Sequence, residues 1–170
     1  MVFFSQGNRW TGVRIFLVGL LIYFFWRKEL RKPGILAMVS WPIANAACDA
    51  LKFGLKGTRP CVDLPDVVLH VDKLTSYGTA SAHSATMMSV AVAFWLYSRP
   101  WGIAWFVVAI MTGISRIYVG VHYPYQVVLG WLVGAVTALI VVKTWEAWVR
   151  LRAAKASAES APDEQLSEAQ

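Results

Sequence analysis

The chain has 170 residues, of which 57% are hydrophobic and only 15% are charged. This composition excludes an ordinary soluble domain, and charges clustered between long apolar runs indicate a protein that crosses a membrane several times. The net charge of +6 does not indicate nucleic-acid binding, because the basic residues lie mostly beside the apolar runs, as the positive-inside rule describes. The two cysteines, Cys48 and Cys61, match no disulfide or metal-site pattern and are predicted to be free.

The first apolar run covers residues 10–26 and is long enough to span a membrane if its flanks contribute. Residues 1–9 before it are predicted to be a short interfacial segment. The run is followed by four basic residues, Arg27, Lys28, Arg31 and Lys32, whereas a signal peptide carries its basic residues before the apolar region. No small-residue cleavage site comes after them. The run is therefore predicted to be a retained anchor whose C-terminal end lies in the cytoplasm.

The second predicted span, residues 33–53, ends in a row of polar residues. Their spacing alternates between four and three, which places them on one helical face if the helix persists: Asn45, Asp49, Lys52, Lys56 and Arg59. An ion pair of Asp49 with Lys52 or Lys56 would explain the end of a helix at an interface. The complete row instead predicts an inward-facing polar site, because charge inside a membrane is costly.

Residues 61–78 are predicted to be a solvated loop with His70 exposed, because the Asp and His residues of this loop match no metal-site spacing. Three more spans follow: residues 79–97, 101–118 and 124–142. Two pairs of small residues at a spacing of four predict close packing of helices within one bundle: Ala109 with Gly113, and Gly130 with Gly134.

The fold class that these patterns predict is all-α, a polytopic membrane helix bundle with about five to six transmembrane helices. Residues 1–152 form its membrane-embedded domain. Residues 153–170, rich in Ala, Ser, Glu and Gln, are predicted to be a disordered cytoplasmic tail. In a five-span arrangement the basic clusters lie on the cytoplasmic side. The opposite side faces the periplasm or the exterior of a cell (inner) membrane. It receives all the polar residues that are unusual beside apolar runs: Lys52, Arg59, Ser81, His83, Arg116 and His122.

These groups together match the needs of phosphoryl transfer. Lys52, Arg59 and Arg116 supply three cations that can neutralise a phosphate and the charge that develops during transfer. The helix start at Ser81 offers unpaired N–H groups to an anion. Two histidines, His83 and His122, can divide the roles of nucleophile and leaving-group acid, and no glycine-rich nucleotide loop is present.

Three motifs in this order resemble the signature of the type 2 phosphatidic acid phosphatase family, the membrane lipid phosphate phosphatases whose fold is shared with vanadium haloperoxidases. The motifs are Lys52-x6-Arg59-Pro60, Ala80-Ser81-Ala82-His83 and Ser115-Arg116-x5-His122. The family pattern is K-x6-RP, PSGH and SR-x5-H-x3-D. The match covers residues 52–126 and extends weakly into the flanking spans.

The resemblance implies that His122 attacks phosphorus and forms a phosphohistidine, and that His83 protonates the leaving oxygen. The residues expected to hold the phosphoryl oxygens are Lys52, Arg59, Ser81, the Ala82 amide and Arg116. No metal ion or other cofactor is expected. The chain departs from the pattern where Ala80 and Ala82 replace Pro and Gly. Ala82 keeps the backbone N–H that the contact with an anion requires.

Gln126 replaces the final Asp of the family pattern, the carboxylate that orients the nucleophilic histidine. Its amide oxygen can accept the Nδ1–H of His122, or its NH2 group can favour the wrong tautomer of the ring. Asp49 is a further candidate for the missing negative charge. The sequence alone leaves these alternatives open.

The function that the sequence predicts is hydrolysis of lipid phosphate or lipid diphosphate head groups at the outer face of the membrane. The candidate substrates are phosphatidate, phosphatidylglycerol phosphate, undecaprenyl diphosphate and lipid A phosphates, and the expected partners are membrane lipids. A lipid phosphotransferase is a close variant. A non-catalytic protein that binds or transports lipid phosphates is the alternative from another class, and Gln126 is the residue that supports it.

Overall fold

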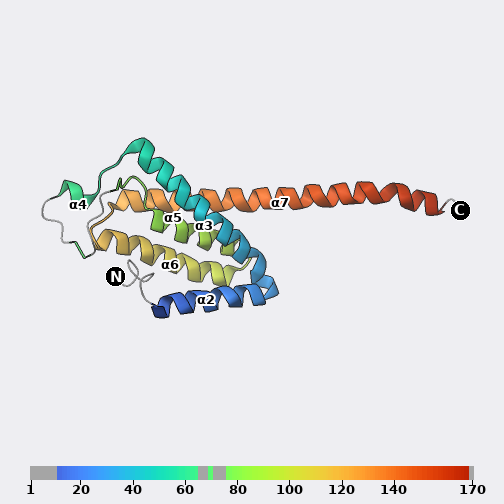
Figure 1. Cartoon of the computed structure of the whole chain (residues 1–170), viewed down its shortest axis with the longest axis horizontal. Coiled ribbons are helices and arrows are strands. Elements are labelled where there is room, and N and C mark those ends of the chain that lie inside the picture. Colours follow the sequence, from blue (N-terminus) through green and yellow to red (C-terminus); the bar gives the residue numbers. More distant parts are fainter. Residues whose placement is uncertain (1–10, 65–68, 71–75, 169–170) are drawn as a thin grey trace.

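A computed structural model describes residues 11–64, 69–70 and 76–168 of the chain. The predicted interfacial segment, residues 1–9, lies outside the described residues. The described residues form a bundle of helices, drawn in Figure 1: α2 (Thr11–Trp26), α3 (Lys28–Leu55), α4 (Pro60–Asp63), α5 (Ala82–Trp95), α6 (Arg99–Tyr118) and α7 (Pro124–Glu168). The predicted all-α class is confirmed.

Three helices among the described residues are long and apolar enough to cross a membrane, within Lys28–Asp63, Arg99–Tyr118 and Pro124–Ala158. Their outward faces carry exposed apolar side chains, as a surface in contact with lipid requires: Ile103, Val107 and Ile110 on α6, and Leu132, Val136 and Ile140 on α7. The first and third predicted spans also form helices, but α2 has 16 residues and α5 has 14. At 1.5 Å per residue, α5 is about 21 Å long, less than the hydrocarbon core.

Helix α5 lies at the centre of the bundle, in contact with α3, α6 and α7. The predicted small-residue pairs lie where helices approach closely within the bundle, α7 against α5 and α6 against α7. A Cβ atom added to Gly130 would lie 2.5 Å from the carbonyl oxygen of Ser81, and one added to Gly134 would collide with the carbonyl oxygen of Ala85. On α6, the Ala109 carbonyl accepts a 3.2 Å hydrogen bond from the Trp131 indole. The expectation of packing within one bundle is confirmed.

Substituting Gly134 with alanine is expected to lower the free energy of unfolding by about 1–3 kcal/mol, because the methyl group must push α7 away from α5. The matched control is Gly19→Ala on α2, where an added Cβ meets no atom within 4 Å and alanine favours the helix. Thermal unfolding in detergent measures both. A Gly134→Ala protein that is as stable as the control would contradict the close approach.

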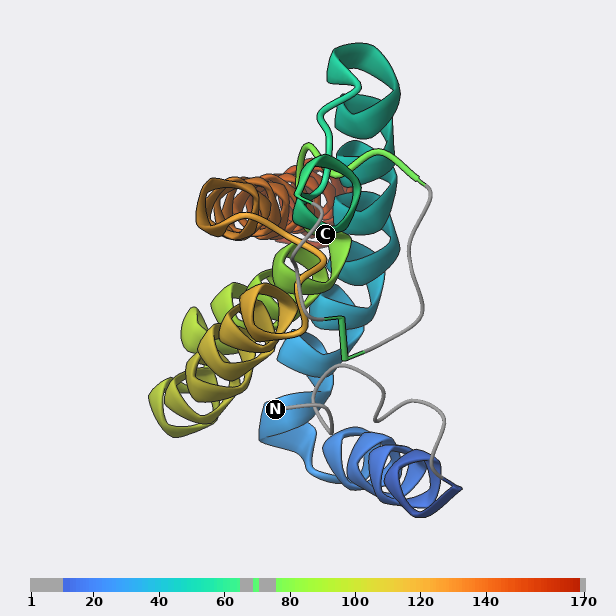
Figure 2. The ribbon, with the colours of Figure 1, turned by 90° about the vertical axis from the view of Figure 1, so that its left-hand side faces the viewer.

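Helix α2 packs on the bundle mainly through its C-terminal end. The Phe24 ring lies 4.7 Å from the ring of Phe94 and 4.9 Å from that of Trp101, centroid to centroid. Figure 2 shows α2 at one side of the bundle, next to the start of α3 and away from α7. The aromatic cluster therefore joins α2 to α5 and α6 near the basic end of the bundle, where α2 turns into α3.

Several boundaries differ from the sequence predictions. Helix α3 begins at Lys28, five residues early, and contains both Pro33 and Pro42 in its interior, so neither proline ends the helix although each removes one backbone donor. The predicted loop, residues 61–78, contains α4 at its start, with Pro60 in its first turn. Helix α7 continues through Glu168 and projects beyond the bundle (Figure 1), which accords with the helix propensity of the alanine-rich segment from residue 153.

Candidate active site

The candidate site residues lie at the end of the bundle opposite to the basic cluster at Arg27. The last turns of α3 and α6 meet the first turns of α5 and α7 there, together with α4 and the turn between α6 and α7. Because successive helices run in opposite directions, residues 52, 81, 116 and 126 arrive at the same end. The structure thus brings together the three motifs that the sequence separates.

Lys52 lies in the last turn of α3 and is held by an ion pair. Its Nζ atom is 2.8 Å from Oδ1 of Asp49, and the other carboxylate oxygen of Asp49 accepts a 3.0 Å hydrogen bond from Asn45. This is one of the two pairs expected from the sequence. Asp49 therefore positions a cation, and the contacts found for its carboxylate lie along α3. Lys56 ends the helix in the left-handed conformation and is exposed.

Arg59 precedes α4 and is almost completely buried, with 3% of its surface exposed. Its guanidinium group donates to the carbonyl oxygen and hydroxyl of Ser76, and to the carbonyl oxygens of Tyr77 and Val121. Its Nη1 atom also lies 3.0 Å from Nε2 of His122. All five N–H groups of this side chain thus have partners, so Arg59 binds the candidate nucleophile directly.

The start of α5 supplies the anion-binding geometry that the second motif predicts. Ser81 is the N-cap residue, its hydroxyl accepts a 3.4 Å hydrogen bond from the Ser84 N–H, and Ala82 is the first helical residue. The Ser81 N–H donates to the Gln126 carbonyl at 3.0 Å, which ties the start of α5 to the start of α7. The first N–H groups of a helix and its dipole favour a negative charge at this point.

A tight turn places His122 beside Arg116. Arg116 is buried in the last turn of α6, and its carbonyl oxygen accepts hydrogen bonds from the N–H groups of Val121 and His122, both at 3.3 Å. The turn requires a positive φ of 78° at Gly120, a conformation that glycine adopts without steric cost. The third motif is therefore compact, and both of its charged or titratable residues point into the protein.

Gln126 is fully buried and its amide makes four hydrogen bonds. Nε2 donates to the Thr58 carbonyl at 2.7 Å and to the Tyr125 hydroxyl at 3.2 Å. Oε1 accepts from the Tyr123 N–H at 3.2 Å and lies 3.0 Å from Nδ1 of His122. The reverse orientation would place two donors against each other at Tyr123 and two acceptors against each other at Thr58, so the oxygen faces the histidine.

The tautomer of His122 follows from its two neighbours. The guanidinium of Arg59 can only donate, so Nε2 of His122 accepts and carries no proton. Nδ1 carries the proton instead and donates it to the amide oxygen of Gln126. This tautomer leaves the nitrogen lone pair on Nε2, where a nucleophile needs it. The amide oxygen of Gln126, and not its NH2 group, thus faces the ring of His122.

The electrostatic surroundings of His122 keep its ring neutral. Burial and the positive charge of Arg59, followed by the charges of Arg116 and Lys52, lower the pKa of His122 to about 3, although its bond to Gln126 acts in the opposite direction. The three predicted cations therefore all act on this one ring. His83 lies in the first turn of α5 under the influence of the same three charges, and its side chain is accessible from outside.

Sequence reasoning missed several residues that hold this site together and proposed one role that the contacts do not support. The missed residues include Thr58, whose carbonyl orients Gln126, and Gly78, where an added Cβ would lie 2.6 Å from Cγ of Arg59 and 3.1 Å from Oε1 of Gln126. A backbone carbonyl leaves no signal in a sequence. Asp49, suggested as a substitute charge for His122, is bound to Asn45 and Lys52 instead.

Comparison with known proteins supports the family that the three motifs indicate. An undecaprenyl-diphosphatase of Sulfolobus acidocaldarius is 35% identical over 136 residues, which are 79% of the chain and 64% of that protein. A Bacillus licheniformis protein named bacitracin transport permease protein BcrC is 30% identical over 128 residues, 75% of the chain and 63% of that protein. The chain thus spans less than two thirds of the length of these curated relatives.

Two crystal structures share the fold. Aquifex aeolicus LpxE superposes with a TM-score of 0.65 and 27% identity, over 84% of each chain. A transmembrane PAP2 type phosphatidylglycerolphosphate phosphatase from Bacillus subtilis superposes with a TM-score of 0.59 and 22% identity, over 78% of this chain and 70% of that one. The model of the PAP2 superfamily matches residues 33–150, which contain all three motifs and the helices that carry them. The chain is therefore an integral membrane protein that belongs to the PAP2 superfamily.

Proposed function

We propose that the chain is a phosphatase that hydrolyses lipid phosphate or lipid diphosphate head groups through a phosphohistidine on His122, without a metal ion. The observation that carries this proposal is the buried, neutral His122, whose Nδ1–H is held by Gln126 and whose Nε2 lone pair lies among three cations. A neutral imidazole with a fixed lone pair is a nucleophile, and surrounding cations stabilise the charge that develops on phosphoryl oxygens.

In the first step, Nε2 of His122 attacks phosphorus, the P–N bond forms, and the bond to the leaving oxygen breaks while His83, which enters this step protonated beside the bound phosphate anion, donates its proton to that oxygen. In the second step, His83 removes a proton from water, the water oxygen attacks phosphorus, and the P–N bond breaks. Phosphate leaves and both histidines return to their starting forms. Arg59 must release Nε2 before the attack, and its freed Nη1 can then donate to a phosphoryl oxygen.

Undecaprenyl diphosphate is the first substrate to test, because the Sulfolobus relative is named for it. The site is proposed to face the periplasm or the exterior of the membrane. Lys28, Arg31 and Lys32 lie together with Trp145 at the opposite end of the bundle, and basic residues mark the cytoplasmic side. A lipid diphosphate of the outer leaflet would then reach the site with its head group in water.

Phosphate release from the purified chain tests the proposal directly. The panel contains undecaprenyl diphosphate, phosphatidate, phosphatidylglycerol phosphate and lipid A phosphates, each in detergent with a chelator. Release from at least one lipid is expected. Binding without release from any of them would instead support a lipid-phosphate binding or transport protein, a role favoured by the name of the Bacillus licheniformis relative and by Gln126. Release that needs an added acceptor lipid would identify a phosphotransferase.

Replacing Gln126 with aspartate is expected to raise the pKa of His122 above about 3, because a carboxylate beside Nδ1–H favours the charged ring. Turnover at neutral pH should be preserved or increased, since the carboxylate also stabilises the phosphorylated ring. The chain has three histidines, so an NMR titration with His70→Ala and His83→Ala for assignment measures the change. An unchanged pKa, or a large loss of turnover, would show that the amide has a role of its own.

A further inference from the structure

A small pocket of about 300 Å³ lies at the end of the bundle opposite to the candidate active site, where α7 leaves the bundle (Figure 1). The first turns of α3 form one wall, and α7 forms the other. Three cations, two aliphatic side chains and one indole line it: Lys28, Arg31, Lys32, Ile35, Leu36 and Trp145. Among the described residues, no carboxylate belongs to this lining. The pocket therefore has the composition of a site for an anion that carries an apolar part.

The charged and apolar parts of the pocket follow each other along one face of α3. Lys28, Arg31, Lys32 and Ile35 have the spacing of residues that share a helical face. Ile35 lies two turns, or about 11 Å, beyond Lys28 along the helix axis, and the neighbouring Leu36 is only 3% exposed. A phospholipid has the same order, because its phosphate is followed by the glycerol and then by the acyl chains.

The carboxylates near the pocket are bound by other cations. Oε2 of Glu29 lies 3.5 Å from Nε of Arg27, outside the lining. Oε2 of Glu146 lies 3.4 Å from Nζ of Lys143, and the same carboxylate interacts electrostatically with Lys32. Of the three cations of the pocket, Lys32 is therefore the one whose charge is partly balanced by the protein itself.

Lys28 and Arg31 are the cations that remain available to a ligand. Nε of Arg31 donates to the Phe25 carbonyl at 3.1 Å, which fixes the guanidinium at the start of α3 and leaves its two NH2 groups to other acceptors. Nζ of Lys32 instead lies over the Tyr97 ring, 4.4 Å from its centroid. Within the described part of the chain, no ion pair neutralises Lys28 or Arg31. Two neighbouring cations on one helix repel each other, and a bound anion would relieve this repulsion.

Trp145 places the pocket at the level of lipid head groups. Tryptophan prefers the interface between membrane and water, and the Trp145 ring is partly exposed and lies 5.3 Å from the ring of Trp148. Basic pockets between transmembrane helices bind the head groups of anionic lipids. A free phosphate ion would use only the cations, whereas a lipid also contacts Ile35 and Trp145. The lining therefore favours a lipid as the source of the phosphate.

We propose that this pocket binds the phosphodiester of one anionic phospholipid from the leaflet opposite to the candidate active site. Lys28 and Arg31 hold the phosphate oxygens, and Ile35, Leu36 and Trp145 contact the glycerol and the upper part of the chains. The bound lipid joins the start of α3 to α7 and so stabilises the folded bundle, because it binds the folded chain only. The proposal is independent of the reaction at the candidate active site.

Native mass spectrometry of the chain in detergent tests the proposal with phosphatidylglycerol and the zwitterionic phosphatidylcholine as probes. The double variant Lys28→Gln/Arg31→Gln is expected to weaken the binding of phosphatidylglycerol about thirtyfold, because each basic residue beside an anionic lipid contributes roughly fivefold. The matched control is Arg99→Gln/Arg150→Gln, which removes two exposed cations from the same end of the bundle but outside the pocket. The control should bind phosphatidylglycerol as the unsubstituted chain does.

Three results would each contradict the pocket. Equal losses in the two double variants would show a general attraction to positive charge. Equal affinities of the unsubstituted chain for phosphatidylglycerol and phosphatidylcholine would show that the phosphodiester charge is not recognised. Displacement of the lipid by inorganic phosphate at a similar concentration would identify a site for free anions, in which the apolar wall and the indole have no role.

The candidate active site also carries cations and needs a control of its own. Lys52→Gln removes one of them at the other end of the bundle and should leave the binding of phosphatidylglycerol unchanged. A loss in this variant, with normal binding by Lys28→Gln/Arg31→Gln, would place the lipid at the active site and overturn the proposal. Thermal unfolding gives a second readout: phosphatidylglycerol should raise the unfolding temperature of the unsubstituted chain but not that of Lys28→Gln/Arg31→Gln. Without lipid the two should unfold at similar temperatures, since both replaced side chains are exposed.

Discussion

Replacing His122 with alanine is expected to reduce phosphate release by a thousandfold or more, on the order of the loss found when other enzymes lose a nucleophile. The substitution removes the nitrogen that forms the bond to phosphorus, and no other described side chain offers a lone pair at that position held by both Arg59 and Gln126. Single-turnover assays with undecaprenyl diphosphate measure the chemical step, and acid-labile phosphate on the unsubstituted protein should disappear in the variant.

The matched control is His70→Ala. His70 is exposed and stacks on the ring of Tyr118 at 5.1 Å, and within the described part of the chain no hydrogen bond or ring contact joins it to His122. We expect its variant to retain full turnover. A His122→Ala protein that folds and releases phosphate within about tenfold of the unsubstituted chain would remove His122 from the mechanism, since a tenfold change corresponds to only about 1.4 kcal/mol of the barrier.

The second large effect is expected for Gln126→Leu, because the leucine side chain is similar in size to that of glutamine but has no hydrogen-bonding groups. The Thr58 carbonyl and the Tyr123 N–H lose a partner in a buried site, which should lower the free energy of unfolding by about 1–3 kcal/mol. His122 also loses the acceptor that keeps the proton on Nδ1, so turnover per folded molecule should fall about a hundredfold.

Tyr125→Phe is the matched control for Gln126→Leu. The Tyr125 hydroxyl accepts one of the four hydrogen bonds of Gln126 but belongs to a side chain that is 60% exposed, where water can replace it. Thermal unfolding and turnover should both stay close to those of the unsubstituted chain. If Gln126→Leu loses stability but keeps its turnover per folded molecule, Gln126 supports the fold and does not position the nucleophile.

Sequence patterns were sufficient to predict the helices and to predict that the site residues meet at one end of the bundle, because both follow from local rules. Apolar runs of membrane length become helices, and antiparallel helices bring alternate ends together. The same rules do not determine the orientation of the Gln126 amide. That orientation depends on the Thr58 carbonyl, 68 residues earlier in the chain, and on Gly78, whose lack of a side chain leaves room for Arg59 and for Oε1 of Gln126. Contacts of this kind form only when the complete bundle folds.

The ends of helix α5 differ from the predicted span for another reason. Its apolar run predicts a full span over residues 79–97, yet Ser81 caps the helix in an extended conformation and residues 79–80 form a bend before it. The hydrogen bond from the Ser81 N–H to the Gln126 carbonyl holds this segment outside the helix. A tertiary contact at the site therefore shortens the helix, and composition alone does not show where such a contact falls.

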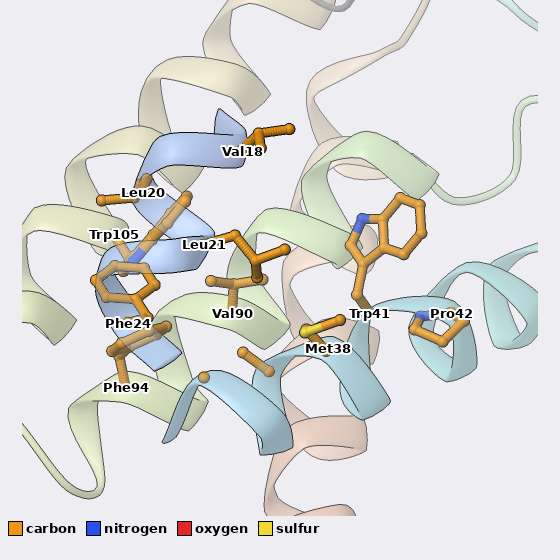
Figure 3. Close-up of a pocket in the computed structure, with 12 residues that line it drawn as sticks. Val18, Leu20, Leu21, Phe24, Met38, Trp41, Pro42, Val90, Phe94 and Trp105 are labelled. Carbon is orange, nitrogen blue, oxygen red and sulfur yellow. The ribbon is translucent and has the colours of Figure 1, made fainter. Parts of the chain in front are cut away.

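The attachment of α2 has a consequence for how such proteins diversify. Every candidate catalytic residue lies within residues 33–150, the part that the superfamily model matches, whereas α2 (Thr11–Trp26) lies before it. Helix α2 lines one side of an apolar groove whose other walls come from α3, α5 and α6 (Figure 3), and it carries none of the candidate site residues. Substitutions in α2 can therefore change how the bundle packs and meets the surrounding lipid while the candidate site stays the same, so the two parts of the chain can vary separately in evolution.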